Sequence, residues 1–140
     1  MSKVLIDSLQ TAADRAGDLT PLVYKRLFTR LPETEVLFLR DSDGSIRGSM
    51  LSWVFLMVLD FSDPQTYGAK MIQNEVLTHE GYGVSADQFI VFFEVLSETV
   101  RETLGEDWTQ PIGAAWNELL ADMIWCAQNP YEDSRRLNRP

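Results

Sequence analysis

The chain has 140 residues, 45% of them hydrophobic, and a formal net charge of −9 at pH 7. Phosphate binding needs a basic face, so this charge argues against nucleic acid as a partner. The one loose basic cluster lies near the C-terminus, at Arg135, Arg136 and Arg139, and we interpret it as a solvated end.

The chain also lacks the usual marks of secretion or membrane insertion. Its single cysteine, Cys126, leaves no partner for an internal disulfide, and the N-terminus has no sustained apolar segment typical of a signal peptide. The longest apolar-rich run, Met50 to Leu59, is about half of the roughly 20 residues that span a bilayer. These features predict a soluble, cytoplasmic, reduced protein with no membrane partner.

Helical periodicity runs through nearly the whole chain, and no alternating strand is flanked by hairpin turns. A short turn follows Pro32 and carries the chain to Phe38. The predicted helices cover about residues 2–15, 21–31, 46–59, 64–80, 85–104 and 109–127. The pattern therefore predicts an all-α single domain over residues 1–140, with a core over 3–128 and a polar tail over 129–140.

Local signals mark where several of these helices begin. Thr20 is predicted as an N-cap before a first-turn proline, and Ser62-Asp63-Pro64 is a second start of that kind. Residues 85–88, Ser-Ala-Asp-Gln, predict a capping box. The helix over 46–59 is apolar on most of its circumference from Leu51 onward, so we expect it to be buried on more than one side.

His79 is the only histidine, and it lies near the end of a predicted helix in the stretch "THEGYGV". By itself it is typical of a capping residue at the negative end of a helix dipole. A zinc site needs three or four protein ligands, and no G-x-S-x-G elbow accompanies the histidine. A porphyrin, however, supplies four nitrogens to iron, so one imidazole would complete such a site.

Two stretches decide between these interpretations. "VYKRLFTRLPETEVLF" holds Tyr24, Phe28, Pro32 and Phe38, and "THEGYGV" holds the histidine followed by an aromatic residue, glycine and valine. Their order and spacing over residues 3–128 resemble the globin family. The likeness is greatest to bacterial single-domain globins and to the globin domain of flavohaemoglobins.

The resemblance implies a globin fold of six to seven helices around haem b. It implies that His79 is the iron ligand, that Phe38 packs flat on the haem, and that Tyr24 donates a hydrogen bond to a bound gas. The other N–H of the histidine would donate to a carbonyl or side chain. The remaining implied haem contacts are Phe28, Arg47, Met50, Leu51, Val54, Tyr82, Val84, Phe89 and Phe93.

This chain departs from the family pattern on both sides of the expected pocket. On the distal helix, the first position facing the ligand falls at residues 46–48, none of which is His or Gln, so Tyr24 is expected as the main donor. Arg47 could reach a haem propionate, and Met50 either forms the wall or ligates the iron. On the proximal side, Phe89 stands where flavohaemoglobins typically have the tyrosine of a Tyr–Glu pair. Its absence lowers the expectation of peroxidase-like or very fast NO-dioxygenase chemistry.

Three functions remain open at this point. The first is reversible binding of O₂, NO or CO by a carrier, store or sensor. The second is NO dioxygenation with electrons from a separate reductase, and the third is a haem-free signalling module of globin fold. Polar residues on several helices allow a monomer or a homodimer.

Overall fold

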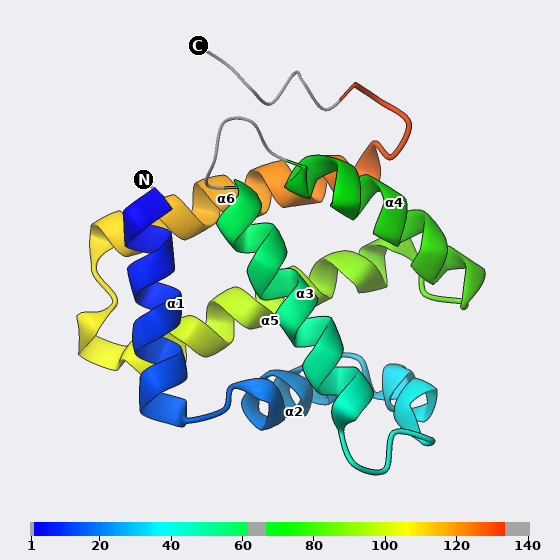
Figure 1. The fold of residues 1–140 in the computed structure, drawn as a ribbon, viewed down its shortest axis with the longest axis horizontal. Coiled ribbons are helices and arrows are strands. Elements are labelled where there is room, and N and C mark those ends of the chain that lie inside the picture. The colour runs from blue at the N-terminus through cyan, green and yellow to red at the C-terminus, as the bar shows by residue number, and fades with distance from the viewer. Residues whose placement is uncertain (1, 62–66, 134–140) are drawn as a thin grey trace.

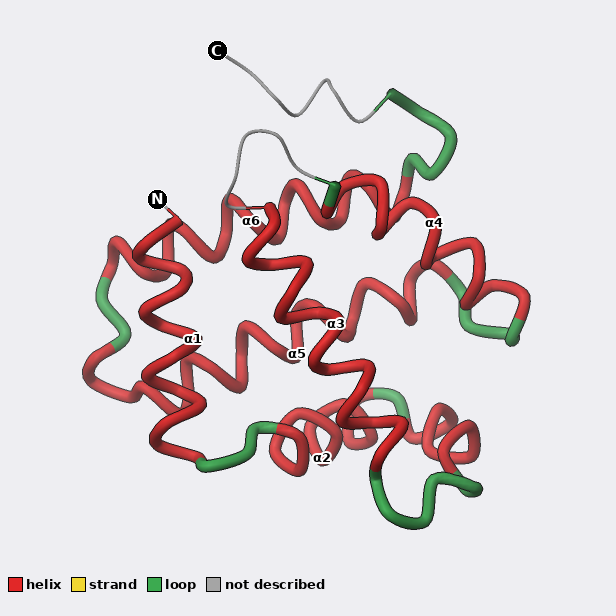
Figure 2. Tube along the Cα trace, in the orientation of Figure 1, coloured by secondary structure: helices red, strands yellow, loops and turns green. Residues whose placement is uncertain are grey.

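The computed structural model describes residues 2–61 and 67–133, and all its regular structure in those ranges is helical (Figures 1 and 2). The all-α prediction is confirmed. The helices are α1 (Ser2–Ala16), α2 (Thr20–Arg30), the 3₁₀ helix η1 (Pro32–Phe38), α3 (Ser45–Phe61), α4 (Gly68–Gly81), α5 (Ala86–Leu104), the 3₁₀ turn η2 (Gly105–Asp107) and α6 (Gln110–Gln128). The predicted start at Ser62-Asp63-Pro64 and the arginines of the tail lie outside the described residues.

The helix starts follow the sequence signals in one case and depart from them in another. The capping box is confirmed: Gln88 N donates to Ser85 Oγ (3.2 Å), and Ser85 N donates to Gln88 Oε1 (3.0 Å). The prediction of Thr20 as N-cap is wrong, since α2 already includes Thr20. Instead, the Asp18 carboxylate accepts from Thr20 N at 2.9 Å, because an ionised acceptor two residues upstream competes well for an unpaired first-turn N–H.

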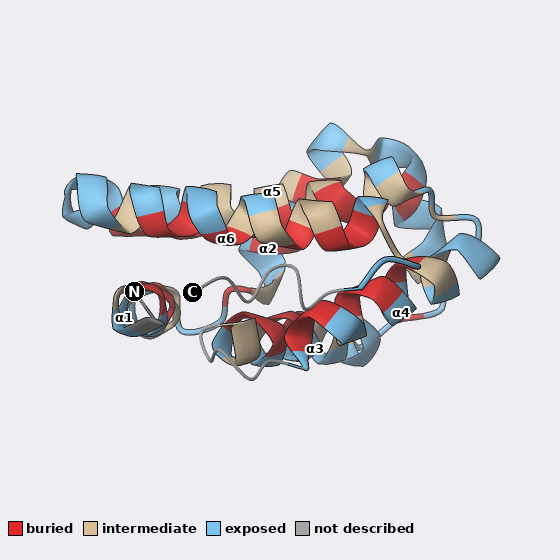
Figure 3. Ribbon diagram, turned by 90° about the horizontal axis from the view of Figure 1, so that it is seen from above, coloured by how far each residue is buried: buried red, intermediate tan, exposed pale blue. Residues whose placement is uncertain are grey.

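Helix α5 forms the centre of the molecule and packs on α1, α2, α4 and α6. Figure 3 shows α5 in one layer and α1, α3 and α4 in the other, with the buried faces of the layers turned toward each other. Across the interior, Trp116 Nε1 of α6 donates to Ser8 Oγ of α1 at 2.9 Å. This bond joins the two ends of the chain around α5 and satisfies a polar group that is fully buried.

Helix α3 does not meet the expectation of burial on more than one side. Trp53 and Leu56 are each 55% exposed, and Leu59 is 41% exposed. The physical reason is position: α3 packs on α4 and on part of α2, and nothing in the described chain covers its outer face. The apolar circumference therefore faces the core on one side and water on the other.

The junction of α3 and α4 depends on a glycine. A Cβ on Gly68 would lie 2.8 Å from Phe61 Cδ2 and 3.1 Å from the backbone oxygen of Met57. Only a residue without a side chain lets α4 start this close to the end of α3. Within the described residues, no helix combines the length and the apolar character that crossing a bilayer requires.

Candidate functional site

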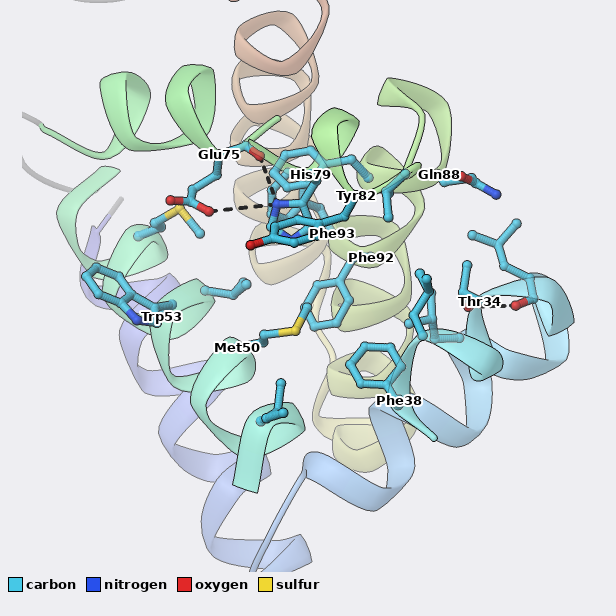
Figure 4. Close-up of a pocket in the computed structure, with 18 of the residues that line it drawn as sticks. Thr34, Phe38, Met50, Trp53, Glu75, His79, Tyr82, Gln88, Phe92 and Phe93 are labelled. Carbon is cyan, nitrogen blue, oxygen red and sulfur yellow. Dashed lines mark hydrogen bonds and ion pairs between the residues drawn. The ribbon is translucent and has the colours of Figure 1, made fainter. Parts of the chain in front are cut away.

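A cavity of about 410 Å³ lies between η1, α3, α4 and the first half of α5 (Figure 4). Most of its wall is apolar and aromatic, as in typical sites for small organic ligands. The sequence-predicted residues that line it are Phe38, Met50, Val54, His79, Tyr82, Val84, Phe89 and Phe93. The structure thus brings together side chains from four separate elements around His79.

The ring of His79 is oriented by a single short hydrogen bond. Its Nδ1 lies 2.8 Å from the carbonyl oxygen of Glu75, one helical turn back in α4. A carbonyl can only accept, so Nδ1 carries the proton of the neutral ring, and Nε2 on the opposite edge keeps the lone pair. The side chain is 26% exposed and its ring lies 5.0 Å from that of Phe89. It is thereby prepared to ligate through Nε2.

The turn after α4 is closed on the backbone of His79. Tyr82 N and Val84 N both donate to the His79 carbonyl, at 2.9 and 3.0 Å. Gly83, the second glycine of "THEGYGV", has a φ of +86°, which L side chains rarely adopt. The turn therefore requires glycine at this position. This geometry places Val84 in the cavity wall and Tyr82, 74% exposed, at the rim.

Phe38 belongs to an aromatic cluster at the end of η1. Its ring lies 5.4 Å from Tyr24, edge to face, and 5.7 Å from Phe28. Of these three rings only Phe38 lines the cavity, and Figure 4 shows it facing the space below His79. Tyr24 and Phe28 lie behind it, so they support the wall instead of forming it.

The hydroxyl of Tyr24 is already bonded in this structure. It donates to the carbonyl oxygen of Arg47 at 3.0 Å and thereby joins α2 to the first turn of α3. The residue is 2% exposed, and burial raises the pKa of the phenol above its ordinary value, so it stays a protonated donor. Tyr24 was expected to point at a bound gas, whereas here its donor is used for packing two helices.

Arg47 also departs from the sequence-based expectation. Its Nε donates to Asp41 Oδ2 and its Nη2 to the Asp41 carbonyl oxygen, each at 3.0 Å. The guanidinium therefore faces the loop before α3 and does not line the cavity, where a propionate contact was predicted. The buried acidic side chain attracts the nearest cation, and six residues separate the two in the chain.

Asp41 is the anchor of this loop. Besides the guanidinium, its carboxylate accepts from Ile46 N and Arg47 N, both at 3.0 Å, and so caps α3. Burial alone would raise the pKa of the carboxyl, but the two backbone N–H groups and the arginine together outweigh it and lower the pKa below its ordinary value. The side chain is only 1% exposed, in keeping with this dense set of donors.

One stripe of α3 forms the wall opposite His79. It consists of Ile46, Met50, Trp53, Val54 and Met57, spaced as one face of a helix. Leu51, predicted to touch the cofactor, is 3% exposed and belongs to the core instead. Trp53 and Met57 were not predicted, although their spacing from Met50 contained the signal.

Glu75 is another lining residue that the sequence analysis missed. It lines the cavity on α4, and among the lining residues that the structure describes it is the one with an acidic side chain. Its position four residues before His79 puts both on one helix face, which was the available signal. No group of three or more His, Cys, Asp or Glu side chains able to hold a metal ion occurs in the described chain.

The Globin family model matches residues 58–124, which cover α4, α5, most of α6 and the end of α3. The match includes His79 and the helix that carries it. Over this matched segment the chain is similar to the globin family. No solved structure matches the chain. Globins are typically haem proteins. The matched segment contains His79 and the α4 and α5 walls of the cavity, while the walls from η1 and most of α3 lie outside it.

Proposed function

We propose that this protein is a haem-binding globin, that His79 would ligate the iron of haem b in the cavity, and that it reversibly binds O₂, NO or CO as a carrier, store or sensor. The observation that carries the proposal is the bond from His79 Nδ1 to the Glu75 carbonyl, at 2.8 Å. It leaves the lone pair of Nε2 available beside a large apolar space, as an iron ligand requires.

The other residues present fit a porphyrin. Phe38 offers a flat ring, Phe89 and Phe93 pack edge to face at 5.2 Å beside His79, and Met50 covers the opposite side. When bound, haem supplies the iron at which a gas ligand coordinates. No Lys or Arg occurs among the described lining residues, so the porphyrin carboxylates belong in water at the exposed rim.

The proximal side favours reversible binding over NO dioxygenation. The ring in contact with His79 is that of Phe89, 5.0 Å away, and it has no hydroxyl to donate to or accept from the imidazole. The resemblance to flavohaemoglobins would have required a tyrosine there. An NO dioxygenase would in addition depend on a separate reductase, and measuring NO consumption by the oxygenated protein distinguishes the two functions.

The direct test is a haem titration of the purified protein. We expect a sharp Soret band that shifts on addition of CO to the reduced form. His79→Ala should lose that spectrum, and free imidazole should restore a similar one, because the small ligand fits the space left by the side chain. A His79→Ala spectrum identical to that of the unmodified protein would refute the assigned ligand. Protein that stays colourless with ample haem would favour the haem-free module.

A further inference from the structure

Two oxygens of one residue lie near the proton of His79 Nδ1. The carbonyl oxygen of Glu75 is 2.8 Å from Nδ1, and the side-chain oxygen Oε2 of the same residue is 3.7 Å away. Figure 4 marks both interactions with dashed lines, and the Glu75 carboxylate lies on the cavity side of α4, beside the imidazole. The first distance is a hydrogen bond and the second is an electrostatic contact.

The surroundings leave this carboxylate without a competing charge inside the cavity. The described lining residues include no Lys or Arg, and α5 meets the imidazole through the ring of Phe89. The polar residue that α5 contributes, Gln88, is neutral and donates to Glu33 at 3.3 Å. The Glu75 side chain is 48% exposed, so its charge acts on His79 through partial solvent screening.

We propose that Glu75 is a positioning residue that makes His79 a more electron-donating ligand. This rests on the proposed function, since it concerns the strength of the histidine–iron bond. A negative charge next to Nδ1–H stabilises positive charge that builds up on the ring when Nε2 donates its electron pair. The effect resembles that of the Tyr–Glu pair of flavohaemoglobins, whose tyrosine position is occupied here by Phe89.

The size of the effect follows from the exposure of the carboxylate. A half-exposed charge pair contributes about as much as surface ion pairs do, which corresponds to roughly a 2- to 5-fold change in an equilibrium constant. Stabilising positive charge at the ligand favours the ferric over the ferrous state. The ferrous-to-ferric ratio at a fixed potential is therefore expected to rise roughly 2- to 5-fold when the charge is removed.

The experiment uses the full chain loaded with haem and compares Glu75→Gln with Glu80→Gln. Glutamine keeps the size of the side chain and removes its charge. Glu80 is the matched control, because it adjoins His79 in α4 but does not line the cavity. The readouts are the iron–imidazole stretching frequency of the reduced protein, by resonance Raman, and the ferrous-to-ferric ratio.

We expect Glu75→Gln to lower the stretching frequency and raise the ratio, Glu75→Asp to lie between it and the unmodified protein, and Glu80→Gln to change neither. If Glu75→Gln matches the unmodified protein in both readouts, or if both glutamine variants shift them equally, the inference is overturned. An unmodified protein that binds no haem overturns the proposed function itself, and this is seen before any variant is compared.

Discussion

Helices α3 and α5 are similar in length, and α3 is the more apolar of the two, but they differ in what surrounds them. Helix α5 buries nine residues because it is enclosed by α1, α2, α4 and α6. Helix α3 buries only Leu51, Val54, Met57 and Val58, and it leaves Trp53 and Leu56 in water. The comparison teaches that helical periodicity predicts a helix, while the neighbours of the helix decide how many of its sides are covered.

Two leucines test this difference directly. Leu96 on α5 is 1% exposed and Leu56 on α3 is 55% exposed. Leu96→Ala should lower the free energy of unfolding by about 2–5 kcal/mol through lost burial and a cavity. Leu56→Ala should change it by less than about 0.5 kcal/mol. Urea denaturation of both variants measures the difference, and equal losses would mean that something covers the outer face of α3.

Asp41 tests what holds the first turn of α3. Asp41→Asn removes the charge that attracts Arg47 and two backbone N–H groups, so the urea midpoint should fall at neutral pH. The pKa of the Asp41 carboxyl is lower in the folded state than in the unfolded chain. The ionised carboxylate therefore contributes its full stabilisation at pH values above the ordinary, unfolded pKa. This contribution is lost as the pH falls through the folded-state pKa.

The difference between Asp41→Asn and the unmodified protein should therefore shrink in acid, which unfolding measured from neutral pH downward will show. Asp7→Asn is the control, because it removes an exposed carboxylate on α1 and leaves the first turn of α3 unchanged. A difference that stays constant down to strong acid would show that the charge of Asp41 does not act in the folded state.

A pair of glycines sharpens the comparison at the two ends of α3. Gly68→Ala would place a methyl group 3.1 Å from the backbone oxygen of Met57, and we expect a loss of about 1–3 kcal/mol by thermal or urea unfolding. Gly48→Ala meets no atom within 4 Å, and we expect a gain of about 0.5–1 kcal/mol from helix propensity. If both substitutions changed the free energy of unfolding in the same direction, the result would contradict the tight packing of α4 on α3.

A smaller effect than that of Leu96 or Gly68 concerns the hydroxyl between α2 and α3. Tyr24→Phe removes the donor to the Arg47 carbonyl and should cost about 0.5–1.5 kcal/mol of stability. Because the hydroxyl is engaged there, the dissociation rate of O₂ from the haem-loaded protein should change by less than about tenfold. A tenfold or larger increase, measured by stopped flow, would show that the hydroxyl turns to the gas ligand, as the family resemblance implies.

Much of the site was predictable because its signals are local. Ser85 and Gln88 lie three residues apart and form the capping box, and Gly83 follows His79 closely enough to define the turn. Glu75 and Met57 were missed, although each lies at helical spacing from a predicted residue. Arg47 and Asp41 are only six residues apart, so their ion pair could also have been predicted from the sequence.

By itself the sequence determined the helices, most of their ends, and the placing of one imidazole beside a sharp turn. These depend on hydrogen bonds and side-chain spacing within a few residues. Only the tertiary structure decided that the Tyr24 hydroxyl bonds to the Arg47 carbonyl, that Leu51 faces the core, and that Trp53 lines the cavity yet remains half in water. Each of these depends on which distant segment covers a side chain. The helical spacing of apolar residues marks a buried face but does not identify the segment that covers it.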